Sequence, residues 1–312
     1  MIDRLGRLLG LLLLLTAFAV AWSRAPDLPV EALVARWAPP PSDFLDLDGQ
    51  LVHYRDLGPR TDPLPIVLLH GTSASLHTWE GWMAELAKTR RVIAFDLPGF
   101  GLTGPRADRD YARDADARFT LAVLDRLRVQ RFVAGGNSLG GMVAWRVATL
   151  APERVDRLIL VDAAGLPGTV RDIPLGWRIA RTPGLGKLAE WMLPREIVAE
   201  GLAKSYGDPK RVTHELVDRY WQLTLREGNR AALRDRLRQF EPGVDAERIA
   251  TIRQPTLILW GGRDRVIAPA AAEEFERRIP GSQRVVFPDL GHVPQEEDPA
   301  ATLVPVKAFL GL

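Results

Sequence analysis

Short, uninterrupted apolar runs recur along this chain, with segments of helical pattern between them. The runs cover residues 66–69, 92–95, 132–134, 158–161 and 256–260. Strands that are apolar on both faces are typical of a parallel sheet whose two sides are covered by helices. The helical segments between the runs cover residues 79–88, 115–127, 139–150 and 270–277. This alternation predicts an α/β fold with a mostly parallel, doubly wound sheet.

Two parts of the chain depart from that alternation. Near the start, an alternating apolar pattern surrounds Asp48-Gly49, which predicts an antiparallel hairpin. Between residues 167 and 253 there is no strand-like run, but there are several helical patterns. This stretch is far too long for a crossover loop, so we expect residues 167–253 to form a helical cap over the carboxyl edge of the sheet. The α/β core would then consist of residues 43–166 and 254–312.

The N-terminal residues carry a separate signal. Residues 8–22 form an almost unbroken apolar run that follows Arg4 and Arg7. Two interpretations stay open for residues 1–24, an uncleaved membrane anchor or a secretory signal peptide. Residues 25–42 contain three consecutive prolines and are expected to form a stiff linker. The basic residues before the run favour a membrane-anchored protein with its folded body outside the cytoplasm, or a secreted or periplasmic protein if the leader is cleaved.

Composition excludes several classes of function. Lys and Arg total 41 against 39 Asp and Glu, a balance too even for a nucleic-acid-binding protein. The absence of cysteine excludes disulfides, thiolate metal sites and a cysteine nucleophile. Residues 99–104 match the dinucleotide-binding pattern G-x-G-x-x-G, but Pro98 and Pro105 flank them and no apolar helix follows. We therefore expect no cofactor and no metal, and a small molecule as the partner.

The strongest chemical motif is Gly136-Asn137-Ser138-Leu139-Gly140, which lies directly between an expected strand and an expected helix. In that context G-x-S-x-G forms a sharp turn that lifts the serine hydroxyl clear of the sheet. We expect Gly136 and Gly140 to be required because strand and helix meet there too closely for side chains. The amide of Leu139 would lie at a helix N-terminus, where negative charge is favoured. The alternative is an ordinary turn in which Ser138 caps the helix.

A serine nucleophile needs a base and an acid that orients the base. A last strand is expected at residues 284–287, before a final helix. His292 follows this strand and Asp264 follows the run at 256–260, so we expect both to act with Ser138. Asp162, at the end of an earlier strand, is the rival to Asp264. An oxyanion hole needs two amides directed at one point. We expect the amide of Thr72 to join that of the residue after the serine.

Residues 43–312 resemble the α/β-hydrolase superfamily, specifically its cap-bearing serine hydrolase branch. The resemblance rests on a nucleophile, an acid and a base in this chain order and on two loops, namely Ser138, Asp264, His292, His70-Gly71 and Asp96-Leu97-Pro98-Gly99-Phe100-Gly101. It implies an α/β-hydrolase fold. It also implies a role for each site residue: Ser138 as nucleophile, His292 as general acid and base, Asp264 as its orienting partner, and Thr72 and Leu139 as oxyanion donors.

The expected reaction is hydrolysis of a carboxylic ester of an apolar substrate through an acyl-enzyme on Ser138. One alternative comes from the Gly-Asn-Ser-Leu-Gly-Gly elbow, which is similar to that of carbon–carbon bond hydrolases acting on aromatic ring-fission products. Those enzymes typically carry a His-Gly-x-Gly-Pro loop and a tryptophan after the catalytic histidine. Here the loop is His70-Gly71-Thr72-Ser73-Ala74, and Val293 follows the histidine. The other alternative is a non-catalytic protein that binds a ligand under the cap. The sequence leaves the substrate and the oligomeric state open.

Overall fold

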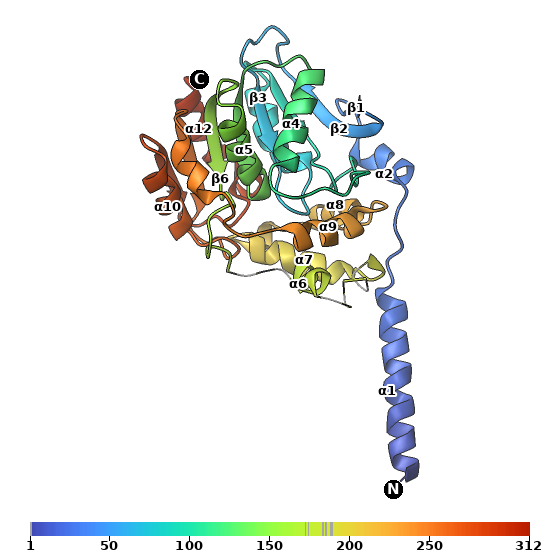
Figure 1. Cartoon of the computed structure of the whole chain (residues 1–312). Coiled ribbons are helices and arrows are strands. Elements are labelled where there is room, and N and C mark those ends of the chain that lie inside the picture. Colours follow the sequence, from blue (N-terminus) through green and yellow to red (C-terminus); the bar gives the residue numbers. More distant parts are fainter. Residues whose placement is uncertain (1, 172, 174, 183, 185, 188–189) are drawn as a thin grey trace.

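An eight-stranded sheet forms the centre of the molecule, in the order β1-β2-β4-β3-β5-β6-β7-β8. The structure is a computed structural model that describes residues 2–171, 173, 175–182, 184, 186–187 and 190–312 (Figure 1). The strands are β1 (Asp43–Leu47), β2 (Gln50–Leu57), β3 (Ile66–Leu69), β4 (Val92–Phe95), β5 (Phe132–Asn137), β6 (Val155–Val161), β7 (Thr256–Gly261) and β8 (Gln283–Phe287). Strand β2 pairs antiparallel with β1 and β4, and every other pairing is parallel. The predicted α/β fold with an antiparallel hairpin at its start is confirmed.

Helices cover both faces of the sheet because successive side chains of each strand point to opposite sides. In β3, Ile66 and Leu68 pack in the apolar cluster that also contains residues of α3 (Glu80–Leu86) and α12 (Pro299–Leu310). Val67 and Leu69 of the same strand join the cluster on the other face. That second cluster includes residues of α4 (Ala115–Arg126), α5 (Leu139–Leu150) and α10 (Ala270–Arg278). Strands buried on both sides explain why the apolar runs were uninterrupted.

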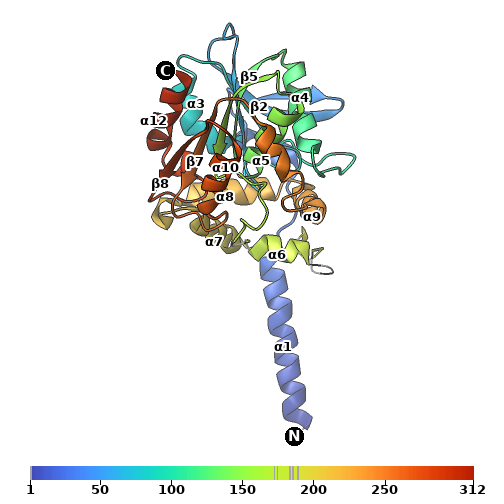
Figure 2. The same ribbon diagram turned by 60° about the vertical axis from the view of Figure 1, so that its left-hand side comes forward.

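A helical cap is inserted between β6 and β7, as the sequence predicted. It contains α6 (Leu175–Arg181), α7 (Arg195–Ser205), α8 (His214–Thr224) and α9 (Asn229–Gln239), with short 3₁₀ turns at Pro209–Arg211 and Ala246–Thr251. Figures 1 and 2 show these four helices gathered at one end of the sheet, on the side from which α1 emerges. The cap therefore covers one edge of the sheet and leaves the faces to the core helices.

The expectation of a membrane anchor in residues 1–24 is wrong. Helix α1 (Ile2–Ser23) extends away from the body of the protein (Figures 1 and 2). Among the described residues, however, no helix is both long enough and apolar enough to cross a bilayer. The apolar run at 8–22 rises only about 22 Å in a helix, against a hydrocarbon core of about 30 Å. The same finding corrects the membrane contact and the membrane-anchored location outside the cytoplasm that were expected from this run.

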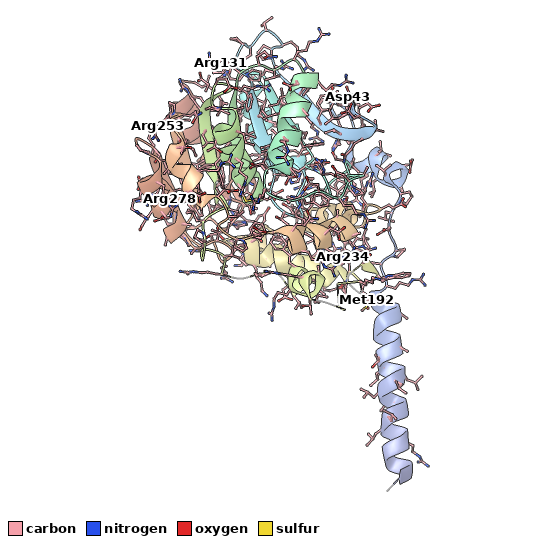
Figure 3. All side chains as sticks on the ribbon, viewed as in Figure 1. Asp43, Arg131, Met192, Arg234, Arg253 and Arg278 are labelled. Carbon is pink, nitrogen blue, oxygen red and sulfur yellow. The ribbon has the colours of Figure 1, made fainter. Side chains whose placement is uncertain are left out.

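Residues 24–37, here called the strap, lie against the cap. They include α2 (Val30–Trp37), which falls within the segment expected as a proline-rich linker. The contacts of the strap with the cap include β-bridges from Arg24 to Met192 and from Leu28 to Arg226, an ion pair of 2.6 Å between Asp27 and Arg230, and a 2.9 Å hydrogen bond from Trp37 to Gln222. Figure 3 shows Met192 and Arg234 at the edge of the cap next to the end of α1. The strap thus joins the segments on either side of α7 and α8.

Candidate active site

Ser138 occupies the turn between β5 and α5. Its backbone has φ 54° and ψ −115°, a conformation that residues other than glycine rarely adopt. The surrounding backbone holds this turn: the Ser138 amide donates to Val161 O at 3.0 Å, and the Ser138 carbonyl accepts from the amides of Met142 and Ala164, each at 3.0 Å. The serine therefore lies at the carboxyl end of a central strand and directly before a helix N-terminus, as the sequence indicated.

The glycines on either side of Ser138 have a steric reason. A methyl group on Gly136 would lie 2.1 Å from the carbonyl oxygen of Gly140. A methyl group on Gly140 would lie 2.1 Å from the carbonyl oxygen of Leu69 in the neighbouring strand. Both contacts are with backbone, which cannot move aside as a flexible side chain can. Only glycine lets strand and helix approach each other this closely.

Asp264 and His292 are in direct contact. Asp264 follows β7, and its Oδ1 accepts hydrogen bonds from the amides of Val266 at 2.7 Å and Ile267 at 3.0 Å. Its other oxygen, Oδ2, lies 2.8 Å from His292 Nδ1. Both side chains are buried, and the His292 amide donates to Ser205 O in the cap at 2.7 Å. With Nδ1 bonded to the carboxylate, Nε2 is the nitrogen left for proton transfer.

Asn137 connects the serine turn with the histidine loop. Its Nδ2 donates to the carbonyl oxygens of His292 at 2.9 Å and Val161 at 3.2 Å, and its side chain is almost fully buried. The residue before Ser138 is therefore bonded to the backbone of His292, the expected base. The sequence analysis assigned Asn137 no role. Its place inside the G-x-S-x-G motif was the only signal, and that signal does not identify a partner from a distant loop.

The loop expected to supply the second oxyanion donor also packs against the serine. A methyl group on Gly71 would lie 3.1 Å from Ser138 Cβ, so the backbone before Thr72 lies close to the side chain of Ser138. His70 supports this loop: its Nδ1 donates to Gly71 O at 2.7 Å and its Nε2 accepts from Leu97 N at 2.9 Å. Burial lowers the pKa of His70, which keeps the ring neutral and able to accept that bond.

Two cavities share lining residues near Ser138. The first, here called the serine chamber, has a volume of about 320 Å³, and Ser138, Leu139 and Thr72 all line it. The second, here called the cap chamber, has a volume of about 240 Å³ and is lined mainly by apolar residues of the cap. Thr72 and Trp177 line both, and Trp177 Nε1 donates to Ser73 Oγ at 3.2 Å. Trp177 of α6 therefore lies between the serine chamber and the apolar cap chamber.

Comparisons with known proteins agree with this architecture. The α/β hydrolase fold family matches residues 65–299. The 2-hydroxymuconate semialdehyde hydrolase of Pseudomonas sp. (strain CF600) is 31% identical over 256 residues, which cover 79% of this chain and 86% of that protein. The dihydrolipoyllysine-residue acetyltransferase component of the acetoin cleaving system of Pseudomonas putida is 30% identical over 269 residues, covering 85% of this chain and 68% of that protein.

Solved structures give the same answer. A meta-cleavage product hydrolase from Pseudomonas fluorescens IP01 superposes with a TM-score of 0.75 at 26% identity, covering 86% of this chain and 97% of that one. The match to the family extends over most of the chain, and it includes the serine turn and the loops that carry Asp264 and His292. The chain is therefore a hydrolase that belongs to the α/β hydrolase family.

Proposed function

We propose that this protein is a serine hydrolase in which Ser138 attacks a carbonyl carbon, His292 transfers the proton and Asp264 orients the imidazole. The observation that supports this assignment best is the 2.8 Å contact between His292 Nδ1 and Asp264 Oδ2. The hydrogen bond from Asn137 to the His292 carbonyl adds to it, because it links the base to the turn of the nucleophile. The amides of Leu139 and Thr72 would hold the oxyanion, since both residues line the chamber of Ser138.

The substrate class that we propose first is a ketone produced by aromatic ring fission, cleaved at a carbon–carbon bond. The support comes from relatives: a hydrolase of 2-hydroxymuconate semialdehyde is 31% identical to this chain, and one of 2-hydroxy-6-oxo-2,4-heptadienoate from Pseudomonas putida is 30% identical. The elbow Gly136-Asn137-Ser138-Leu139-Gly140-Gly141 agrees with that group. These names favour carbon–carbon hydrolysis over the ester reaction that we expected first from the sequence.

In the proposed reaction Ser138 Oγ adds to the ketone carbonyl while His292 Nε2 takes its proton. The carbon–carbon bond then breaks, and its electron pair passes into the conjugated carbonyl system of the leaving fragment, which receives the proton from His292. Ser138 now carries the acyl group as an ester. Water that loses a proton to His292 attacks this ester, and collapse of the intermediate releases the acid and returns the proton to Ser138.

Ester hydrolysis is the second candidate, and it uses the same three residues. It is favoured by the loop after β3, where Ser73 and Ala74 stand in place of the Gly-Pro of the carbon–carbon hydrolases, and by Val293 in place of tryptophan. The cleavage step differs only in the leaving atom, because an alcohol oxygen takes the proton from His292 instead of a carbon. The two reactions can therefore be separated by substrate alone.

The experiment compares both substrate classes on the full chain. Initial rates are measured with 2-hydroxy-6-oxo-2,4-heptadienoate, a ketone of the proposed class, and with a panel of aryl esters, and the serine is labelled with a fluorophosphonate. We expect labelling that disappears in Ser138→Ala, and a higher kcat/KM on the ring-fission product than on any ester. A higher kcat/KM on an ester would reverse the order of the two candidates. Labelling or turnover that persists in Ser138→Ala would defeat the assignment of the nucleophile.

A further inference from the structure

A second carboxyl group lies beside the contact between Asp264 and His292. Asp162 follows β6, which pairs in parallel with β7, so the carboxyl ends of both strands meet at one edge of the sheet. The amide of Gly261 donates to Asp162 Oδ1 at 3.0 Å. One side-chain nitrogen or oxygen of each of Asp162, Asp264 and His292 falls within 4.8 Å of the other two. Both candidate acids of the sequence analysis therefore stand within reach of the same imidazole.

Asp162 has two features that are unfavourable for the stability of the fold. It is fully buried, and its backbone has φ 45°, in the left-handed region. Its Oδ2 is shielded from solvent, and the only side-chain hydrogen bond given for this carboxyl within the described residues is the one that neutral Asp162 shares with Asp264. Burial of a carboxyl group and a left-handed backbone each lower the stability of the folded state. On stability alone, glycine or a small apolar residue would therefore be favoured at this position.

Asp162 is held in its neutral form. Burial raises its pKa well above the usual range, and the negative charges of Asp264 and Glu297 act in the same direction. The titratable groups around it are Asp264 on the loop after β7, His292 on the loop after β8, and Glu297 of α11 (Pro294–Glu297). Asp264, the neighbouring carboxyl group, accepts hydrogen bonds from two backbone amides and contacts the imidazole of His292.

We propose that Asp162 is a reserve positioning residue for His292, which takes over the orientation of the imidazole when Asp264 is lost. The proposal rests on the proposed triad of Ser138, Asp264 and His292. Replacement of Asp264 by alanine removes one of the negative charges that raise the pKa of Asp162, and it takes away the carboxylate that contacts the imidazole. Asp162 can then ionise and accept the hydrogen bond from His292 Nδ1.

The test is a double-mutant comparison of Asp162→Asn and Asp264→Ala on the full chain, with the substrate that the first experiment identifies. Asparagine keeps the acceptor for the Gly261 amide and tolerates a positive φ, so Asp162→Asn is built to fold. Loss of the orienting aspartate from a serine triad costs about 10⁴-fold in kcat when nothing replaces it. We expect Asp162→Asn to reduce kcat at least about tenfold more in the Asp264→Ala background than in the native background.

The pH profile is the readout that a purely structural role would not change. Asp264→Ala should gain an additional rise of kcat with pH as Asp162 ionises, and the double variant should lack that rise. If Asp264→Ala does not fold, Asp264→Asn, which keeps the acceptor for Val266 and Ile267, replaces it. If Asp162→Asn reduces kcat by the same factor in both backgrounds and Ser138→Ala is inactive, this proposal alone is overturned. An active Ser138→Ala would overturn the triad and this proposal with it.

Discussion

Asn137→Ala tests whether the serine turn and the histidine loop act as one unit. In the native protein Asn137 Nδ2 donates to the carbonyls of Val161 and His292. The Val161 carbonyl also accepts from the Ser138 amide at 3.0 Å, so it remains paired in the variant. The His292 carbonyl has no second donor within the described part of the chain. One buried carbonyl without a partner costs about 1–3 kcal/mol, and we expect the free energy of unfolding to fall by that amount.

The same change should slow catalysis more than it weakens binding. Without the bond from Asn137, the loop of His292 can shift relative to Ser138, and a misplacement of about 1 Å can cost about 10²-fold in rate. We expect kcat to fall by about tenfold to 10²-fold with little change in KM. Urea unfolding of the native protein and the variant measures the change in the free energy of unfolding, and initial rates measure kcat and KM.

Gln50→Ala is the matched control for that experiment. Gln50 Nε2 also donates to two backbone carbonyls, those of Gly104 and Pro105, but it lies half-exposed at the surface. Water can replace its hydrogen bonds, so its loss should change the free energy of unfolding by no more than about 0.5 kcal/mol. If Asn137→Ala is as stable as Gln50→Ala and keeps the native kcat, the coupling between the two loops does not exist.

Three further changes have defined outcomes. Gly140→Ala places a methyl 2.1 Å from Leu69 O and should lower the free energy of unfolding by about 1–3 kcal/mol or more, whereas Gly201→Ala, in α7 with nothing within 4 Å, should raise it by about 0.4–1 kcal/mol. Equal urea midpoints for the two variants would contradict the steric argument. Trp177→Ala should join the serine and cap chambers and raise the relative kcat/KM for longer substrates by about tenfold. An unchanged chain-length profile would show that Trp177 does not divide the space. Burial lowers the pKa of His77 to about 4, so the unfolded chain binds more protons between about pH 6.5 and pH 4; stability should fall by up to about 3 kcal/mol as the pH drops through that window. Urea unfolding at several pH values measures this loss, and an equal loss in His77→Gln would refute it.

The sequence predicted the sheet where each strand is buried on both faces. The expected runs at 66–69 and 92–95 coincide with β3 and β4, because every side chain in them is buried. The run expected at 158–161 begins three residues late, since β6 starts at Val155 with the half-buried Asp156 and Arg157. The hydrophobic pattern of a sequence identifies the part of a strand that helices cover. It misses a polar end, which belongs to the strand only through backbone hydrogen bonds to its neighbours.

Contacts between distant segments could not be predicted in the same way. The hydrogen bond from Asn137 to the His292 carbonyl joins residues 155 positions apart, and no periodic pattern in the sequence indicates it. The use that the fold makes of the glycines at 99–104 could not be foreseen either. That loop packs around a buried carboxylate: Asp96 accepts from the Leu102 amide at 2.8 Å, and a methyl on Gly101 would lie 2.0 Å from Asp96 Oδ2.

The strap limits how this chain can be shortened. Met192 and Arg230 line the cap chamber, and both also touch residues 24–37. A fragment that starts at Arg24 retains these contacts of the strap. One that starts after Trp37 loses two β-bridges, an ion pair and the hydrogen bond to Gln222 together. A chain shortened for crystallisation should therefore begin at or before residue 24, because a start after residue 37 removes contacts that hold two residues lining the cap chamber.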